Sequence, residues 1–292
     1  MHKYLRAIGF SKLQDKKALK EILTDVVMTS TDRDYTKLNE QENVAIMSKN
    51  ISPSLGISVC GDLEDDNHFV YDYYFPYLRG YLKSLQDEIT VERHSSQISY
   101  AGSCEDMGLG AVIIFYLQNF IGYMKAKKQN KLTNPYVSLT ALSVNGRILL
   151  PLAKNSTEKK NARVLAEKRK SLMQDARKGV ESAIESLTMQ DVGIFNTLSK
   201  KIQESDLYSL VDTSFIPCGV ECDNYAVVGE ILQFRQETNM YTHEKICILT
   251  ISCNNIMMDI AINELDLMGE PAVGRRFKGD IWLQGSVHVP AT

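Results

Sequence analysis

Cysteine and histidine are scarce in this chain, and neither is clustered. Six cysteines in 292 residues do not form the dense disulfide framework of a small secreted protein. We therefore expect reduced thiols, most of them buried as small apolar side chains. The five histidines are scattered without the spacing of metal ligands. We expect no metal site and no cofactor.

Excess charge of either sign is also lacking. Lys and Arg number 33 and Asp and Glu number 36, which gives a formal net charge of −3. So small a charge recruits neither nucleic acid nor an anionic membrane to the whole molecule, and any polyanion must bind a local patch. The opening residues 1–6 lack the apolar core of a signal peptide. We predict a cytoplasmic protein.

The sequence motifs of common enzymes are missing. There is no phosphate-binding loop, no dinucleotide fingerprint and no nucleophile elbow. One weak alternative is a nucleophilic Cys104, placed just before a predicted helix whose backbone donors favour a thiolate. His94 would act as its base. The acidic neighbours Glu105 and Asp106 oppose this, so the sequence leans away from an enzyme.

The longest uncharged stretch covers residues 107–124. Its length of about 18 residues is near the lower limit for a bilayer span. Gln118 and Asn119 lie within it, and three glycines dilute it. We predict a helix that is buried in a protein core, and no membrane.

The first region, residues 1–154, has the pattern of an α+β domain. Apolar spacing predicts an amphipathic helix over Lys16–Met28. The following β-like runs are Val44–Met47, Ile57–Cys60, Phe69–Tyr77 and Ile89–Tyr100. Asn145-Gly146 predicts a hairpin turn between two further strands. We expect a largely antiparallel sheet covered on one face by the central apolar helix.

Residues 155–212 change to a helical pattern. Apolar residues recur from Leu165 to Leu187, Gly193 interrupts them, and a shorter helix is predicted from Ile194. The segment is therefore predicted to be a helical hairpin, which serves as a spacer or assembles a homo-oligomer. Its first part, 154–178, is rich in Lys and Arg. This basic helix either stays solvated or binds an acidic partner.

Residues 213–292 return to β structure. Three strands, a short helical turn and a last strand are typical of a small oligonucleotide-binding-like barrel with one of its five strands missing or blurred. A β-sandwich, or a sheet that pairs with the first domain, is the alternative. The chain is thus divided into domains at 1–154, 155–212 and 213–292.

The last strand carries the candidate binding site. Its members are Arg275, Arg276, Phe277, Lys278, Trp282 and Gln284. On such a barrel, cations contact phosphates and aromatic rings stack on bases. Strand alternation puts Phe277 and Trp282 on opposite faces unless a bulge near Gly279 restores the register. The competing interpretation is an ordinary strand with Phe277 in the core.

Three blocks of the sequence resemble a known family. They are the opening Met1–Phe10, the central Leu109-Gly110 with Ile114–Asn119, and the closing Gly269–Gly279 with Trp282–Gly285. They resemble an uncharacterised bacterial family of full-length proteins catalogued as a domain of unknown function. The resemblance implies a bacterial cytoplasmic protein and transfers no catalytic residue, ligand or partner.

Together these patterns favour a non-enzymatic binding or scaffolding protein whose partner is single-stranded nucleic acid or an acidic protein. Two alternatives stay open. One is an enzyme with a Cys104–His94 centre. The other is an oligomeric structural subunit that assembles through the helix face between Leu165 and Leu187.

Overall fold

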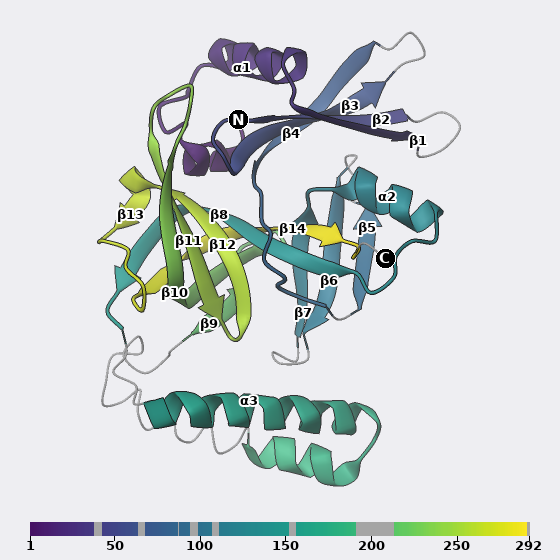
Figure 1. The fold of residues 1–292 in the computed structure, drawn as a ribbon, viewed down its shortest axis with the longest axis vertical. Helices are drawn as coiled ribbons and strands as arrows, with labels where there is room; N and C mark the ends of the chain where they lie inside the picture. The colour runs from purple at the N-terminus through teal and green to yellow at the C-terminus, as the bar shows by residue number, and fades with distance from the viewer. Residues whose placement is uncertain are drawn as a thin grey trace.

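Five strands close into a small barrel in the computed structural model of the chain (Figure 1). The structure describes residues 1–37, 43–63, 68–86, 88–93, 99–106, 111–151, 156–190 and 213–290. The barrel strands are β8 (Tyr136–Leu149), β10 (Asn224–Thr238), β11 (Lys245–Cys253), β12 (Ile256–Asn263) and β14 (Arg276–His288). This confirms the predicted barrel, and its missing strand is β8.

The order around the barrel is β10, β11, β12, β8 and β14, and β14 pairs again with β10. Neighbours are antiparallel except β12 and β8, which run parallel. If β10, β11, β12 and β14 are counted as strands one to four, β8 takes the place of the fifth. However, β8 precedes all of them in the sequence. The last 80 residues therefore contain only four barrel strands.

A second body packs beside the barrel and belongs to the same hydrophobic core. A four-stranded antiparallel sheet contains β1 (Asp32–Lys37), β2 (Asn43–Asn50), β3 (Leu55–Leu63) and β4 (Phe69–Leu78). The strands β5 (Ile89–Arg93), β6 (Tyr100–Asp106) and β7 (Ala111–Leu117) extend the barrel sheet, and β7 pairs with the end of β14. The short pieces are β9 (Ser214–Pro217), β13 (Leu267–Met268), η1 (Lys3–Ile8) and η2 (Glu264–Asp266).

The helix α1 (Lys16–Met28) begins and ends as predicted. Asp15 caps it by accepting hydrogen bonds from the backbone N–H groups of Lys17 and Ala18. Its buried residues include Leu19 and Val26, which confirms the amphipathic helix. The structure is α+β with a largely antiparallel first sheet, as the sequence predicted.

The prediction of a central apolar helix over residues 107–124 is wrong. Residues 111–117 form strand β7, and a short helix, α2 (Phe120–Lys128), follows it. The run from Val112 to Tyr116 is β-branched and aromatic, and such residues favour a strand. Within the described part of the chain, no helix combines the length and apolar character needed to cross a bilayer.

The prediction of a hairpin turn at Asn145-Gly146 is also wrong, because β8 continues through both residues. Gly146 has no room for a side chain: a Cβ atom there would lie 2.5 Å from the Phe277 ring and 2.7 Å from Ile262 Cδ1. The glycine therefore permits close packing inside the barrel instead of a turn.

The helical hairpin is present, but its turn is displaced. The helix α3 (Ser156–Arg177) ends before Gly179, whose φ of 81° suits a glycine, and a second helix covers 181–190. The two helices lie side by side, below the barrel in the view of Figure 1. Arg177 Nη1 contacts Glu105 Oε2 at 2.5 Å and joins α3 to β6. The helix predicted from Ile194 lies outside the described residues.

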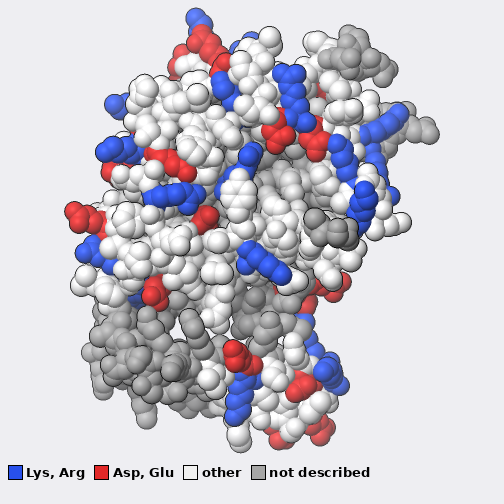
Figure 2. All heavy atoms as spheres, viewed as in Figure 1, with Lys and Arg blue, Asp and Glu red and all other residues white. Residues whose placement is uncertain are grey.

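Acidic and basic side chains are interspersed over much of the face shown in Figure 2. Several Lys and Arg residues gather along the edge where α2 lies. This distribution agrees with the small net charge of −3 and is compatible with local cationic surfaces.

A candidate binding trough on the barrel

Four of the six predicted site residues are buried: Arg276 and three uncharged side chains. Of the uncharged three, Phe277 is 0% exposed, Trp282 is 5% exposed and Gln284 is 0% exposed. The Trp282 indole Nε1 donates to Asp223 Oδ2 at 2.8 Å, and its ring stacks on Tyr4 at 5.3 Å between centroids. Phe277 and Trp282 therefore have no exposed face for stacking on a base.

Gln284 has a structural role in the described fold. Its Nε2 donates to the Pro76 carbonyl at 2.8 Å, and its Oε1 accepts from Gln118 Nε2 at 2.8 Å. These bonds satisfy a buried amide and tie β14 to β4 and to the end of β7.

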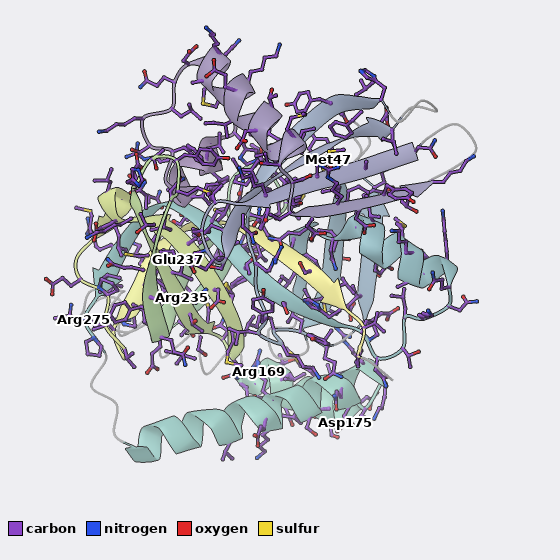
Figure 3. All side chains as sticks on the ribbon, turned by 45° about the horizontal axis from the view of Figure 1, so that its top comes forward. Met47, Arg169, Asp175, Arg235, Glu237 and Arg275 are labelled. Atoms are coloured by element: carbon purple, nitrogen blue, oxygen red, sulfur yellow. The ribbon has the colours of Figure 1, made fainter. Side chains whose placement is uncertain are left out.

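The cations of the predicted site are separated. Arg276 is 5% exposed and its Nε donates to the Leu150 carbonyl at 3.1 Å. Arg275 Nη1 donates to the Glu270 carbonyl at 2.7 Å, and Figure 3 shows Arg275 at the outer edge of the barrel. Lys278 lies in a surface trough instead. A nucleic-acid surface on β14 stays a prediction, and Arg275 and Lys278 are the members with surface positions.

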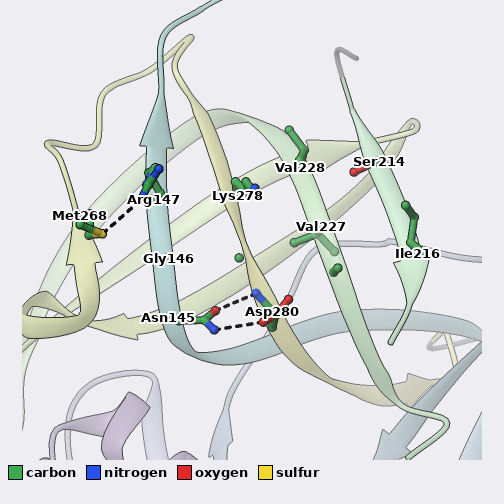
Figure 4. Close-up of a pocket in the computed structure, with 12 residues that line it drawn as sticks. Asn145, Gly146, Arg147, Ser214, Ile216, Val227, Val228, Met268, Lys278 and Asp280 are labelled. Carbon is green, nitrogen blue, oxygen red and sulfur yellow. Dashed lines mark hydrogen bonds between the residues drawn. The ribbon is translucent and has the colours of Figure 1, made fainter. Parts of the chain in front are cut away.

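The trough is a surface depression with a volume of about 470 Å³ (Figure 4). It crosses five neighbouring strands, in the order β13, β8, β14, β10 and β9. Its volume is within the usual range of ligand sites, about 300–1,000 Å³. One row of directly paired residues crosses all five strands: Met268, Arg147, Lys278, Val228 and Ser214.

A second row lies beside the first. It contains Asn145, Asp280, Ala226 and Ile216, which are also paired across neighbouring strands. The Asn145 Nδ2 donates to Asp280 Oδ2 at 3.0 Å, and the Asp280 backbone N–H donates to Asn145 Oδ1 at 3.0 Å. These two bonds hold the carboxylate at one end of the trough (Figure 4).

The charges in the first row are the unusual feature of the trough. Arg147 and Lys278 face each other on adjacent strands, and like charges in that position destabilise a sheet. Arg147 Nη2 contacts Met268 Sδ at 3.8 Å, a weak acceptor. Among the described residues that line the trough, two cations outnumber one carboxylate, Asp280, so this lining is suited to an anionic group.

Sequence reasoning missed most of this site. Lys278 is among the predicted site residues, whereas Arg147 is predicted to follow a hairpin turn, and no residue of β9 is among the predicted site residues. The alternation of Asn145, Gly146 and Arg147 was an available signal, since it puts the two polar residues on one face. Only the pairing of β8 with β14, which is distant in sequence, brings Arg147 to Lys278.

The alternative nucleophile, Cys104, lies within strand β6 and is 1% exposed. It does not precede a helix, because the segment after it forms β7, so the local donors that motivated this candidate are missing. His94 lies outside the described residues. In the described segments, no three His, Cys, Asp or Glu side chains gather in a way that would hold a metal ion.

The fold defines an α+β protein built around a five-stranded barrel with a cationic trough. A family model described as "Domain of unknown function, E. rectale Gene description (DUF3881)" matches residues 5–285. The chain belongs to this family, which confirms the resemblance to an uncharacterised bacterial family. No curated protein and no solved structure matches the chain. The function must therefore be argued from the geometry.

Proposed function

We propose that this protein is a non-enzymatic binding protein whose barrel trough holds an acidic segment of a partner protein. The observation that carries the proposal is the direct opposition of Arg147 and Lys278 across β8 and β14. Keeping two cations in this position lowers the stability of the sheet. A bound carboxylate would neutralise the repulsion.

The spacing of the strands supports a carboxylate as the central group. Paired strands lie about 4.8 Å apart, so one carboxylate between Arg147 and Lys278 can contact both. The Arg147 guanidinium offers a planar pair of donors, and the Lys278 ammonium offers a compact charge. Asp280 limits the cationic region to these two side chains.

The remaining lining supports a polypeptide over nucleic acid as the partner. None of the described residues that line the trough is aromatic, and stacking on bases needs exposed rings. Met268 at one end, and Val228 and Ile216 toward the other, make the trough apolar on both sides of the cations. A segment with an acidic residue between apolar residues would match this pattern.

Binding of a fluorescein-labelled peptide of alternating Glu and Leu, measured by anisotropy over a salt series, tests the proposal. We expect Arg147→Glu to weaken binding by about tenfold or more, which corresponds to about 1.4 kcal/mol. The control is Arg275→Glu, because Arg275 does not line the trough. Salt-independent binding, or an equal loss in both variants, would contradict the proposal.

A cytoplasmic location is part of this proposal. It is supported by the free thiols of Cys60, Cys104, Cys247 and Cys253, all of them buried. Thiol titration of protein purified without reductant and then denatured should detect six reactive groups, the number of cysteines in the chain.

Self-association through the helical hairpin is a second candidate. The observation in its favour is the exposure of apolar side chains on the second helix, where Ile184 is 47% exposed and Met189 is 79% exposed. Light scattering should then show a dimer that Ile184→Glu dissociates. A wild-type monomer at high concentration would remove this candidate.

A further inference from the structure

A second surface, distant from the trough in the fold, combines cations with exposed tyrosine rings. We name it the α2–β1 surface; it contains Tyr35, Lys37, Arg79, Tyr81, Lys125 and Lys128. Tyr35 is 65% exposed and Tyr81 is 74% exposed. By contrast, the aromatic side chains of β14, Phe277 and Trp282, are buried.

Contacts between α2 and β1 hold one half of this surface together. The Lys125 ammonium lies 5.4 Å from the centre of the Tyr35 ring and also pairs with Asp34. The Lys128 ammonium donates to the Lys37 carbonyl. Lysines from the end of the helix are therefore fixed beside an exposed ring.

Arg79, which follows β4, forms the other half. Its Nη2 lies 3.9 Å from Asp32 Oδ2 on β1, and its guanidinium also interacts with the Tyr81 hydroxyl. Next along the chain, the Lys83 ammonium lies 5.6 Å from the centre of the Tyr136 ring. Strand β1 connects the two halves, because its Asp32 contacts Arg79 and its Asp34 contacts Lys125.

Among the described residues of this surface, positive charge predominates. Its acidic residues, Asp32 and Asp34, are each paired with a cation, whereas Lys127 and Lys131 extend the surface with exposed ammonium groups. Figure 2 shows Lys and Arg side chains together where α2 lies. The helix dipole accounts for lysines in the last turn of α2, but it does not account for exposed tyrosines beside them.

We propose that the α2–β1 surface binds single-stranded nucleic acid. Proteins that bind single strands combine cations, which contact the phosphates, with aromatic rings, on which bases stack. Tyr35 and Tyr81 supply the rings, and the lysines of α2 with Arg79 supply the cations. This proposal does not depend on the trough. It places a second, different partner beside the four-stranded sheet instead of on the barrel.

The test uses the full chain and fluorescein-labelled oligo-dT and oligo-U of about 12 nucleotides, a length within the usual site size. We expect Tyr35→Ala combined with Tyr81→Ala to weaken binding by about tenfold with little change in salt dependence. Tyr71→Ala on β4 is the matched control, because Tyr71 is also exposed, by 49%, and lies outside the surface.

Removal of the cations should change the salt dependence of binding, unlike removal of the tyrosine rings. Lys127→Gln combined with Lys131→Gln should make the slope of log K against log salt about 1.4 units less steep, since each phosphate contact on a single strand contributes about 0.7. Lys16→Gln combined with Lys20→Gln on α1 is the control. Circular dichroism of each variant establishes that the fold is retained.

Three outcomes would overturn the proposal. They are salt-insensitive binding, an equal effect of the tyrosine variants and Tyr71→Ala, and tighter binding of the Glu–Leu peptide than of either oligonucleotide at this surface. The last outcome would assign the surface to an acidic protein. Arg147→Glu should leave oligonucleotide binding unchanged, so failure here and failure of the trough proposal are distinguishable.

Discussion

A single buried carboxylate, Glu237, fastens the barrel to the first sheet. It is 9% exposed, and its oxygens accept from Ser52 Oγ at 2.5 Å, Ser54 Oγ at 2.6 Å and the Ser54 N–H at 2.9 Å. Arg235, beside it in Figure 3, donates at 3.3 Å. Burial alone would raise the pKa of Glu237, but hydrogen bonds from Ser52 and Ser54 outweigh it, and the pKa lies below its ordinary value.

This shift predicts a pH-dependent role in stability. A carboxyl whose pKa is lower in the folded state stabilises the fold above its unfolded pKa, and the contribution disappears as pH falls through the folded pKa. At pH 7 we expect Glu237→Gln to lower the free energy of unfolding by about 1–3 kcal/mol.

The difference between wild type and Glu237→Gln should shrink when urea unfolding is repeated at about pH 3. The exposed Glu185 provides a control, and Glu185→Gln should have little effect at either pH. A Glu237→Gln deficit that stays constant with pH would assign the effect to side-chain shape instead of charge.

Gly146 of β8 and Gly122 of α2 have opposite structural roles. A Cβ atom at Gly146 would lie 2.5 Å from the Phe277 ring inside the barrel, whereas a Cβ atom at Gly122 of α2 has nothing within 4 Å. We expect Gly146→Ala to destabilise the protein by about 1–3 kcal/mol through overpacking. Gly122→Ala should stabilise it by up to about 1 kcal/mol through helix propensity. Thermal melts of both variants check the signs, and two changes of the same sign would contradict this account.

At the scale of elements, strong local periodicity was sufficient for prediction. The α1 helix and the strands β10, β11 and β12 follow the sequence patterns closely. The prediction for residues 107–124 failed because a short apolar run fits a buried strand as well as a helix, and pairing with the neighbouring strands β6 and β14 decides the outcome. In β14, residues 281–285 are all buried, so alternation did not separate core from surface there.

The burial of β14 predicts the fluorescence of the sole tryptophan, Trp282. Its 5% exposure and its stacking on Tyr4 should give blue-shifted emission in the folded protein. Acrylamide should quench this emission several-fold less efficiently than that of the guanidinium-unfolded chain. Emission should also be unchanged when oligo-dT saturates the protein. Strong quenching by oligo-dT would instead return Trp282 to the base-stacking role that the sequence suggested.

At the scale of the whole molecule, the candidate trough depends on pairing that no local pattern reveals. Gly146 of β8 is directly opposite Gly279 of β14, and the helical hairpin lies between them in the sequence. The predicted barrel in residues 213–292 was therefore correct in kind but one strand short. Its ligand face was not predictable, because Arg147 belongs to the segment assigned to the first domain.

The shared strand has a consequence for the predicted domains at 1–154, 155–212 and 213–292, which remain a prediction as folding units. Without β8, the fragment 213–292 leaves both β12 and β14 without one neighbour. Unpaired edges of this kind promote association instead of folding. We expect the fragment alone to show no cooperative thermal transition by circular dichroism.

Supplying β8 in a new position should restore folding. His288 at the end of β14 is paired with Tyr136 at the start of β8, and their rings stack at 5.0 Å between centroids. A two-residue Asn-Gly turn can therefore connect them as a hairpin. We expect residues 213–288, joined by this turn to residues 136–150, to melt cooperatively. The same chain carrying Gly146→Val should not, because the added side chain would collide with Phe277 and Ile262 inside the barrel. If the fragment 213–292 melted cooperatively by itself, β8 would be an accessory strand, and the pairing of Arg147 with Lys278 would lose its structural basis.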